Sequence, residues 1–248
     1  MADPAPKESV DGAPAQRTGP GRILGADLPA RIGAAVALMV GALGTAWAGG
    51  YWFGAFWLIA ALLIGAAGAA LANGARPPRL MAGAGVLYAG AMLVSVCLLR
   101  ASRPPGGLDA IVWLFAVVWG TDVMAFFGGR LVGGPKLWPR LSPAKTWSGF
   151  GIGILCGAAA GLLAASAANS IAALFCFGLA TGAVAQGGDL FESALKRRFG
   201  VKDSSGLIPG HGGLMDRLDG FTAAAISTAF VGAARYGIVN MAAGVFQW

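Results

Sequence analysis

Residues 146–188 read TWSGFGIGILCGAAAGLLAASAANSIAALFCFGLATGAVAQGG, a run of more than 40 residues without a charged side chain. Lys145 and Asp189 bound this run. A membrane-spanning helix needs about 20 consecutive apolar residues, so the run predicts two helices with a tight turn near 168–170. A second uncharged run lies between Arg31 and Arg76, and Gly49-Gly50 is its expected turn. The two runs together predict four membrane-spanning helices.

Three shorter apolar stretches predict three more spans. They cover residues 80–99, 108–127 and roughly 219–240, the last with Arg235 near its far end. We expect the Arg235 side chain to snorkel from there to the membrane surface. The predicted fold class is all-α, a polytopic integral membrane protein with about seven transmembrane helices, in a range of about six to nine.

The composition agrees with a membrane protein. The chain has 56% hydrophobic and 12% charged residues, whereas soluble domains carry about 25% charged residues. A water-soluble globule is therefore excluded. Residues 1–27 are polar and rich in Pro, Gly and Ala, which predicts a disordered tail. Residues 28–248 are expected to form one membrane domain, with a helical scaffold at 28–120 and a catalytic region at 121–248.

The net charge of +7 predicts an orientation, because cytoplasmic loops of membrane proteins are enriched in Lys and Arg. A cytoplasmic tail places most of the basic residues on the cytoplasmic side; these are Arg76, Arg79, Arg130, Lys136, Arg140, Lys145 and the cluster at 196–202. Arg100 and Arg103 fall on the opposite side in this arrangement. A missed re-entrant segment would explain that discrepancy.

Glycine recurs every four residues at positions 149, 153, 157 and 161. Residues at this spacing share one helix face, and small residues there let a second helix approach closely. We expect this stripe to be a packing surface without a chemical role.

Six of the 11 acidic residues lie between positions 122 and 219. Asp122 is placed about two turns inside a predicted span, where an ionisable side chain is costly and marks a functional candidate. A paired structural carboxylate is the alternative. Further along, Asp189, Glu192, Ser193 and Lys196 share one helical face. Their carboxylates and hydroxyl can hold a divalent cation and the ammonium can contact a phosphate, although a solvated amphipathic helix end would look the same.

The loop after this helix contains the single histidine, His211, followed by Gly212 and Gly213. Glycines allow backbone N–H groups to turn toward an anion. Asp216 and Asp219 follow one helical turn apart, with Arg217 between them in sequence. A third segment holds Ser142, Pro143, Lys145 and Thr146, which suits a helix start that attracts anions; an ordinary capped helix is the alternative. Carboxylates that can bind Mg²⁺ thus converge with Lys and Arg, as phosphoryl or nucleotidyl transfer requires.

These segments resemble the signature of the phosphatidate cytidylyltransferases, or CDP-diacylglycerol synthases. The matching residues are Ser193-Ala-Leu-Lys196-Arg197, Lys202-Asp203, and Pro209-Gly-His211-Gly212-Gly213-Leu-Met-Asp216-Arg217-Leu-Asp219. Upstream, Gly188-Asp189-Leu190, the Ser142–Trp147 segment and Asp122 through Arg130 are also similar to the family. Two positions depart from it: Phe126 stands where many relatives have Tyr, and Ser148 where many have Glu or Gln.

The resemblance implies that CTP and phosphatidic acid react to give CDP-diacylglycerol and pyrophosphate in phospholipid biosynthesis. It implies Mg²⁺ in a two-cation centre held by Asp189 and Asp216, with a second cation that could be monovalent. It also implies an all-helical membrane fold that is often dimeric, and a homodimer is therefore expected. The expected partners are CTP, phosphatidic acid and membrane lipids, without nucleic acid. The expected location is the bacterial inner membrane, with the active site facing the cytoplasm.

In this interpretation Lys145, Lys196, Lys202 and Arg217 neutralise phosphoryl oxygens. Asp219 and Asp122 complete the metal shell around Asp189 and Asp216. The predicted substrate contacts are Ser142, Lys145, Thr146, Ser193, Lys202, His211, Gly212 and Gly213.

Three other functions share parts of this pattern. A CTP-dependent lipid kinase of the polyprenol or phytol type would use the same kinds of residue but transfer the γ-phosphate. A CDP-alcohol phosphotransferase is excluded because Ala224 stands where its motif needs Arg. A transporter with an ion at Asp122 would not need a His-Gly-Gly loop between two carboxylate-bearing helix ends.

Overall fold

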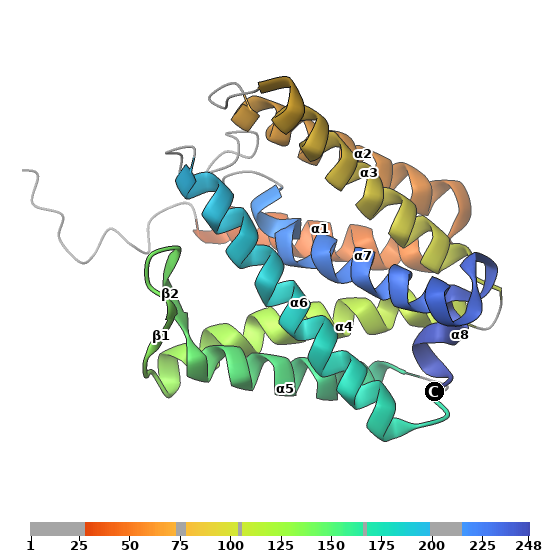
Figure 1. The fold of residues 1–248 in the computed structure, drawn as a ribbon. Helices are drawn as coiled ribbons and strands as arrows, with labels where there is room; N and C mark the ends of the chain where they lie inside the picture. The colour runs from red at the N-terminus through yellow and green to blue at the C-terminus, as the bar shows by residue number, and fades with distance from the viewer. Residues whose placement is uncertain (1–27, 73–77, 104–105, 166–167, 199–214) are drawn as a thin grey trace, which may run out of the picture.

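The computed structural model describes residues 28–72, 78–103, 106–165, 168–198 and 215–248. Figure 1 shows a bundle of long helices with one small β-hairpin at its left end. The helices are α1 (Leu28–Ala48), α2 (Gly50–Ala72), α3 (Pro78–Ala101), α4 (Gly106–Leu131), α5 (Trp147–Ala164), α6 (Ile171–Arg198), α7 (Met215–Tyr236) and α8 (Met241–Phe246). The strands are β1 (Lys136–Trp138) and β2 (Ser142–Thr146), and a short 3-10 helix, η2 (Ile238–Asn240), precedes α8.

Helices α1 to α7 occupy the seven predicted spans, and the all-α polytopic class is confirmed. The α1–α2 turn lies at Gly49, whose φ of 67° is in the left-handed region that favours glycine. Within the described residues, five helices are long and apolar enough to cross a membrane. A sixth span results if α7 and the segment after it, which bends by 116°, are counted together.

The C-terminal segment differs from the prediction of one span ending near 240. Helix α7 ends at Tyr236, the chain reverses at Gly237, and α8 packs back on the bundle with most of its side chains buried. The snorkelling of Arg235 stays a prediction, but its guanidinium has partners within the protein. Its guanidinium donates to the carbonyls of Gly244 (2.7 Å) and Gln247 (2.8 Å) and lies 3.7 Å from the Trp248 ring centroid. Arg235 therefore holds the C-terminal segment in place.

Arg100 lies at the bundle end opposite the hairpin, as the sequence indicated. Its Nε donates to the carbonyl of Ala46 at 2.7 Å, in the last turn of α1. Carbonyls at a helix C-terminus have no partner within the helix and carry a partial negative charge. Arg100 is thus explained as a cap for α1, while the backbone of Arg103 donates to Val239 in η2.

The glycine stripe of α5 packs on α4, which confirms it as a packing surface. A Cβ added at Gly153 would lie 2.8 Å from the carbonyl oxygen of Thr121, and one added at Gly161 would lie 2.6 Å from a methyl carbon of Val117. The opposing residues on α4 also recur every four positions, so the two ridges run together: Trp113, Val117, Thr121 and Ala125. Because lipid tails are as apolar as side chains, such close packing holds helices together in a membrane.

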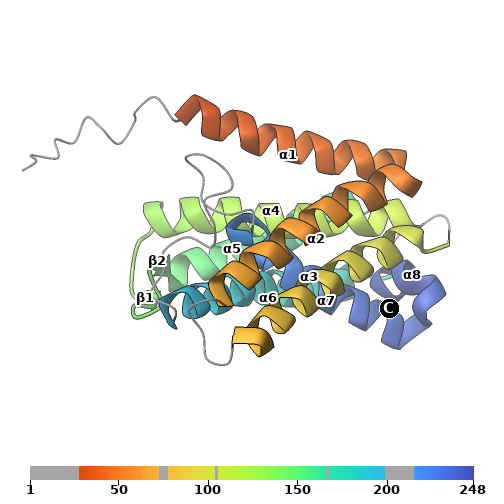
Figure 2. The same ribbon diagram turned by 90° about the horizontal axis from the view of Figure 1, so that it is seen from above.

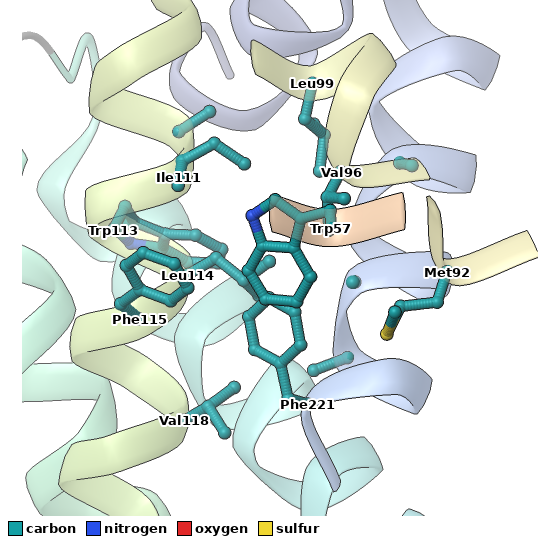
Figure 3. Close-up of a cluster of buried hydrophobic side chains, with 14 of the residues drawn as sticks. Trp57, Met92, Val96, Leu99, Ile111, Trp113, Leu114, Phe115, Val118 and Phe221 are labelled. Carbon is teal, nitrogen blue, oxygen red and sulfur yellow. The ribbon is translucent and has the colours of Figure 1, made fainter. Parts of the chain in front are cut away.

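Aromatic rings from separate helices meet in the core (Figure 3). Trp57 of α2 stacks on Phe221 of α7 with ring centroids 4.9 Å apart, and on Phe115 of α4 at 6.2 Å. All three side chains are buried. Stacked rings of this kind contribute about 0.5–1.5 kcal/mol beyond their burial. This cluster fixes the first turns of α7 against the N-terminal helices.

Different elements lie at the two ends of the bundle, as both Figure 1 and Figure 2 show. One end carries the β-hairpin, the C-terminal end of α6 and the start of α7. The other end carries the α1–α2 turn, α8 and the C-terminus. The residues predicted to carry the chemistry belong to the hairpin end.

The α4–α5 contact generates a stability prediction. Gly157→Ala is expected to lower the free energy of unfolding by about 1–3 kcal/mol, because the added methyl group would overlap Thr121 and the Val117 carbonyl. Gly151→Ala on the same helix is the matched control, since nothing lies within 4 Å of the position its methyl group would take. Thermal unfolding of both variants in detergent checks this. Equal midpoints for the two variants would contradict the assigned contact.

Candidate active site

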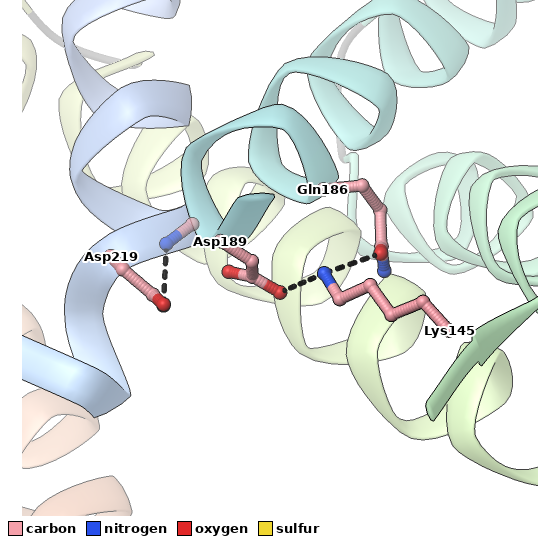
Figure 4. Close-up of polar contacts among 5 residues, drawn as sticks. Lys145, Gln186, Asp189 and Asp219 are labelled. Carbon is pink, nitrogen blue, oxygen red and sulfur yellow. Dashed lines mark hydrogen bonds and ion pairs between the residues drawn. The ribbon is translucent and has the colours of Figure 1, made fainter. Parts of the chain in front are cut away.

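The centre of the candidate site is a contact between the hairpin and α6 (Figure 4). The ammonium of Lys145, on β2, lies 2.7 Å from Oδ2 of Asp189 and donates to Oε1 of Gln186 at 3.0 Å. Asp189 and Gln186 both lie on α6, three residues apart and thus on one helical face. Gln186 is buried, and the two charged side chains are 23% and 21% exposed. An ammonium is therefore fixed beside a carboxylate at the rim of the bundle.

Local structure explains how Lys145 reaches α6. Strands β1 and β2 pair antiparallel, with Lys136 opposite Thr146 and Trp138 opposite Ser142. Thr146 ends β2 and caps α5, because its hydroxyl oxygen accepts the Gly149 N–H at 3.1 Å. The predicted helix start at 142–146 is thus displaced to Trp147, and residues 142–146 are a strand. The strand and the cap together fix the backbone that carries Lys145.

Helices α6 and α7 touch through two glycines, and each glycine is the sequence neighbour of a site aspartate. A Cβ on Gly188 would lie 2.8 Å from the Asp219 carbonyl oxygen, and one on Gly220 would lie 2.6 Å from Oδ1 of Asp189. Any side chain at either position would push the helices apart. The pairs Gly188-Asp189 and Asp219-Gly220 therefore bring the two carboxylates together, and Figure 4 shows Asp189 between Lys145 and Asp219.

The N-terminal helices hold Asp219 from the other side. The hydroxyl of Tyr88, on α3, donates to the Asp219 backbone carbonyl at 3.2 Å. The Thr222 hydroxyl donates to the Leu218 carbonyl at 2.6 Å and lies 3.2 Å from the Met92 sulfur. The Asp219 carboxylate itself accepts the N–H of Gly220 at 2.7 Å. The start of α7 is thus positioned by direct contacts to α3.

Further charged groups surround this centre. On α6, Lys196 Nζ lies 3.6 Å from Oε1 of Glu192, whose side chain is 2% exposed. Asp219 interacts electrostatically with Asp189 and Glu192, and Asp122 on α4 with Asp189 and Lys145. Four carboxylates thus face two ammonium groups within the described part of the site. Carboxylates close together in a poorly hydrated site favour a bound cation.

The donor set fits Mg²⁺, which prefers carboxylate oxygens and retains part of its water shell. Among the described residues, no three His, Cys, Asp or Glu side chains are grouped closely enough to hold a metal ion by themselves. Asp216, the second predicted ligand, lies in the first turn of α7, and its side chain is not among those described. The metal assignment to Asp189, Asp216, Asp219 and Asp122 therefore stays a prediction.

The structure brings together part of the predicted site. Lys145 contacts Asp189, while Asp122 and Asp219 interact electrostatically with Asp189. Ser193 and Lys196 follow on α6, and both are partly buried. Ser142 lies on β2, opposite Trp138. Lys202, His211, Gly212 and Gly213 lie outside the described residues. Asp216 and Arg217 lie in the first turn of α7, but their side chains are not described. The roles assigned to all these residues in catalysis and substrate binding stay predictions.

Gln186 and Tyr88 belong to the site although sequence reasoning gave them no role. Gln186 precedes Asp189 by three residues, so the shared helical face was a usable signal. Tyr88 contacts the site from a segment interpreted as scaffold, 131 residues away in sequence from Asp219. Nothing in the local pattern around Tyr88 indicates that contact.

Residues 25–234 match the family model described as "Cytidylyltransferase family". The chain belongs to the cytidylyltransferase family. The match covers α3 to α6 and all but the last two residues of α7, and so every described residue of the site. It therefore covers the N-terminal helices as well as the motif-bearing half.

Curated relatives carry a more specific name. The chain is 53% identical over 144 residues to a phosphatidate cytidylyltransferase of Brucella abortus, covering 57% of this chain and 53% of the relative. It is 45% identical over 118 residues to the protein of that name from Staphylococcus epidermidis, covering 46% and 45%. It is 41% identical over 128 residues to the phosphatidate cytidylyltransferase of Haemophilus influenzae, covering 49% of this chain and 44% of the relative. The chain thus spans about half the length of the curated relatives it matches.

The Lys145–Asp189 contact generates a prediction about the hairpin. Lys145→Met is expected to make the backbone amides of residues 136–146 exchange hydrogen several-fold faster, because the ion pair ties β2 to α6. Lys136→Met is the matched control, since Lys136 is exposed on β1. Hydrogen-exchange mass spectrometry checks this. Unchanged exchange in Lys145→Met would show that the contact does not hold the hairpin.

Proposed function

We propose that this protein transfers the cytidylyl group of CTP to phosphatidic acid, giving CDP-diacylglycerol and pyrophosphate. The observation that carries the proposal is the Lys145 ammonium held beside the clustered carboxylates of α6 and α7 in a membrane-spanning member of the cytidylyltransferase family. The names of the curated relatives support the choice of phosphatidic acid as acceptor.

The reaction joins two anions, so charge neutralisation is the main task of the site. A phosphate oxygen of phosphatidic acid attacks the α-phosphorus of CTP, the bond to the bridging oxygen of the β-phosphate breaks, and pyrophosphate leaves with the electron pair. A phosphate monoester is already ionised near neutral pH, and therefore no strong general base is required. Lys145, Lys196, Lys202 and Arg217 are proposed to stabilise the phosphoryl oxygens.

Mg²⁺ would supply Lewis-acid stabilisation of the triphosphate and of the leaving pyrophosphate when bound. Asp189 and Asp216 are proposed as its main ligands, with Asp219 and Asp122 completing or orienting the shell. A second cation, monovalent or divalent, is proposed in a neighbouring position. The carboxylate excess around Asp189 supports this proposal. Before substrates arrive, Lys145 balances part of that charge and orients the Asp189 carboxylate, while the Gln186 side-chain oxygen accepts from the same ammonium.

We propose that the site end of the bundle faces the cytoplasm, in the inner membrane of a bacterium. Most of the described basic side chains belong to element ends on that side of the bundle; they are Arg79, Arg130, Lys136, Arg140, Lys145, Lys196, Arg197 and Arg198. Arg100, Arg103 and Arg235 lie at the opposite end, and the guanidinium groups of Arg100 and Arg235 donate to backbone carbonyls there. Cytoplasmic loops carry such an excess of Lys and Arg. The homodimer implied by the family resemblance stays a prediction.

Radiolabelled CTP tests the function. Purified protein in liposomes containing phosphatidic acid is expected to move label from the α-phosphate of CTP into lipid and to leave label from the γ-phosphate in pyrophosphate. Asp189→Asn is expected to lower the rate at least about 100-fold, whereas Asp109→Asn, near the opposite end of α4, retains it. Transfer of the γ-label would indicate a lipid kinase instead. No transfer of either label would refute both.

Metal removal tests the proposed cofactor. Chelation with EDTA is expected to abolish cytidylyl transfer, and Mg²⁺ added in excess is expected to restore it, because the acidic residues would otherwise repel the triphosphate. Calorimetric titration of Mg²⁺ into wild-type protein and Asp189→Asn measures binding apart from activity. Equal affinity in the two proteins would remove Asp189 from the ligand set.

A further inference from the structure

The hairpin that carries Lys145 is strongly basic on its outer side. We call residues 136–146 the basic hairpin; it contains Lys136, Arg140 and Lys145, and no acidic residue occurs anywhere between Asp122 and Asp189. Lys136 and Arg140 are exposed, whereas the ammonium of Lys145 contacts α6. The hairpin therefore presents two cations outward and one inward.

Large apolar side chains accompany these cations. Trp138 is 54% exposed and Trp147, directly after the hairpin, is 55% exposed. Leu131 and Val132, at the end of α4, are 83% and 66% exposed. Lys136 and Trp138 both point outward because alternate residues of a strand share a face, and Leu137 between them is partly buried. The hairpin and the helix ends that it joins thus expose positive charge together with indole and aliphatic groups.

The hairpin connects two helices that can cross a membrane, and this determines what surrounds it. It joins the end of α4 to the start of α5, and both helices are long and apolar enough to cross a membrane. The hairpin therefore lies at the membrane boundary, as its place beside the ends of α4 and α5 in Figure 1 indicates. Trp side chains favour the headgroup level, and basic residues there attract anionic lipid.

We propose that the basic hairpin binds the phosphate headgroup of an anionic phospholipid at the membrane surface and presents phosphatidic acid to the Lys145–Asp189 centre. The acceptor lipid rests on the proposed function; the anionic-lipid surface rests on the hairpin alone. The charge of Lys136 and Arg140 suits a phosphate monoester, and the exposed Trp138 and Trp147 suit the adjoining acyl chains. The exposed aliphatic side chains of Leu131 and Val132 also suit acyl chains, which a dissolved nucleoside triphosphate lacks.

Kinetics in mixed micelles test the proposal. The double variant Lys136→Gln/Arg140→Gln is expected to raise the mole fraction of phosphatidic acid needed for half-maximal rate by roughly 10- to 30-fold, since each basic residue near an anionic surface contributes about fivefold. The kcat and the KM for CTP are expected to stay unchanged. The matched control is Arg79→Gln/Arg198→Gln, which removes two exposed charges at the same end of the bundle but outside the hairpin.

Fluorescence quenching gives a readout that does not depend on activity. Phosphatidic acid brominated on its acyl chains is expected to quench Trp138 more than brominated phosphatidylcholine does, with Trp138→Phe giving the Trp138 contribution by difference. The hairpin double variant is expected to lose this preference, and the control double variant is expected to retain it. Equal quenching by the two lipids, equal kinetics for both double variants, or a raised KM for CTP would overturn the proposal. A wild-type protein that lacks cytidylyl transfer but retains the quenching preference would refute only the proposed function.

Discussion

The close contact between α6 and α7 at Gly188 and Gly220 is the constraint on which the candidate site depends. Each glycine lies next to a site aspartate, so the approach of the two backbones also sets the separation of the two carboxylates. A larger residue at Gly220 would meet Oδ1 of Asp189 at 2.6 Å and displace the side chain that contacts Lys145. The packing of α6 against α7 therefore also determines where the two carboxylates lie.

The charges at this contact are not explained by stability. Burying an ion pair costs desolvation that its attraction often fails to offset, and apolar replacements of similar size are frequently as stable. Here carboxylates outnumber ammonium groups around Asp189, which adds repulsion to that cost. Stability alone would favour removing such a cluster from a membrane protein. Its presence is best explained by ligands that are themselves charged, such as a metal ion and phosphate groups.

The sequence predicted the features that depend on local pattern. Gaps between charges located α1 to α7, and four-residue spacing identified the glycine stripe that packs on α4. Charged segments pointed to Lys145 and Asp189, which meet across 44 residues. The hairpin was missed because its β1 has three residues and its apolar alternation is too short to recognise. Arg235, Gln186 and Tyr88 acquire their partners only through the tertiary fold, so their own segments carry little sign of them.

The N-terminal helices supply no predicted catalytic side chain, yet they determine where the site lies. In a bilayer the surrounding lipid is as apolar as the protein, so helix positions follow from close packing and polar contacts. Trp57 stacks on Phe221, two residues beyond Asp219, and Tyr88 donates to the Asp219 carbonyl. Both contacts act on the first turns of α7, where three of the predicted site residues lie. The scaffold and the motif-bearing half are thus separate in sequence pattern but joined physically at Asp219.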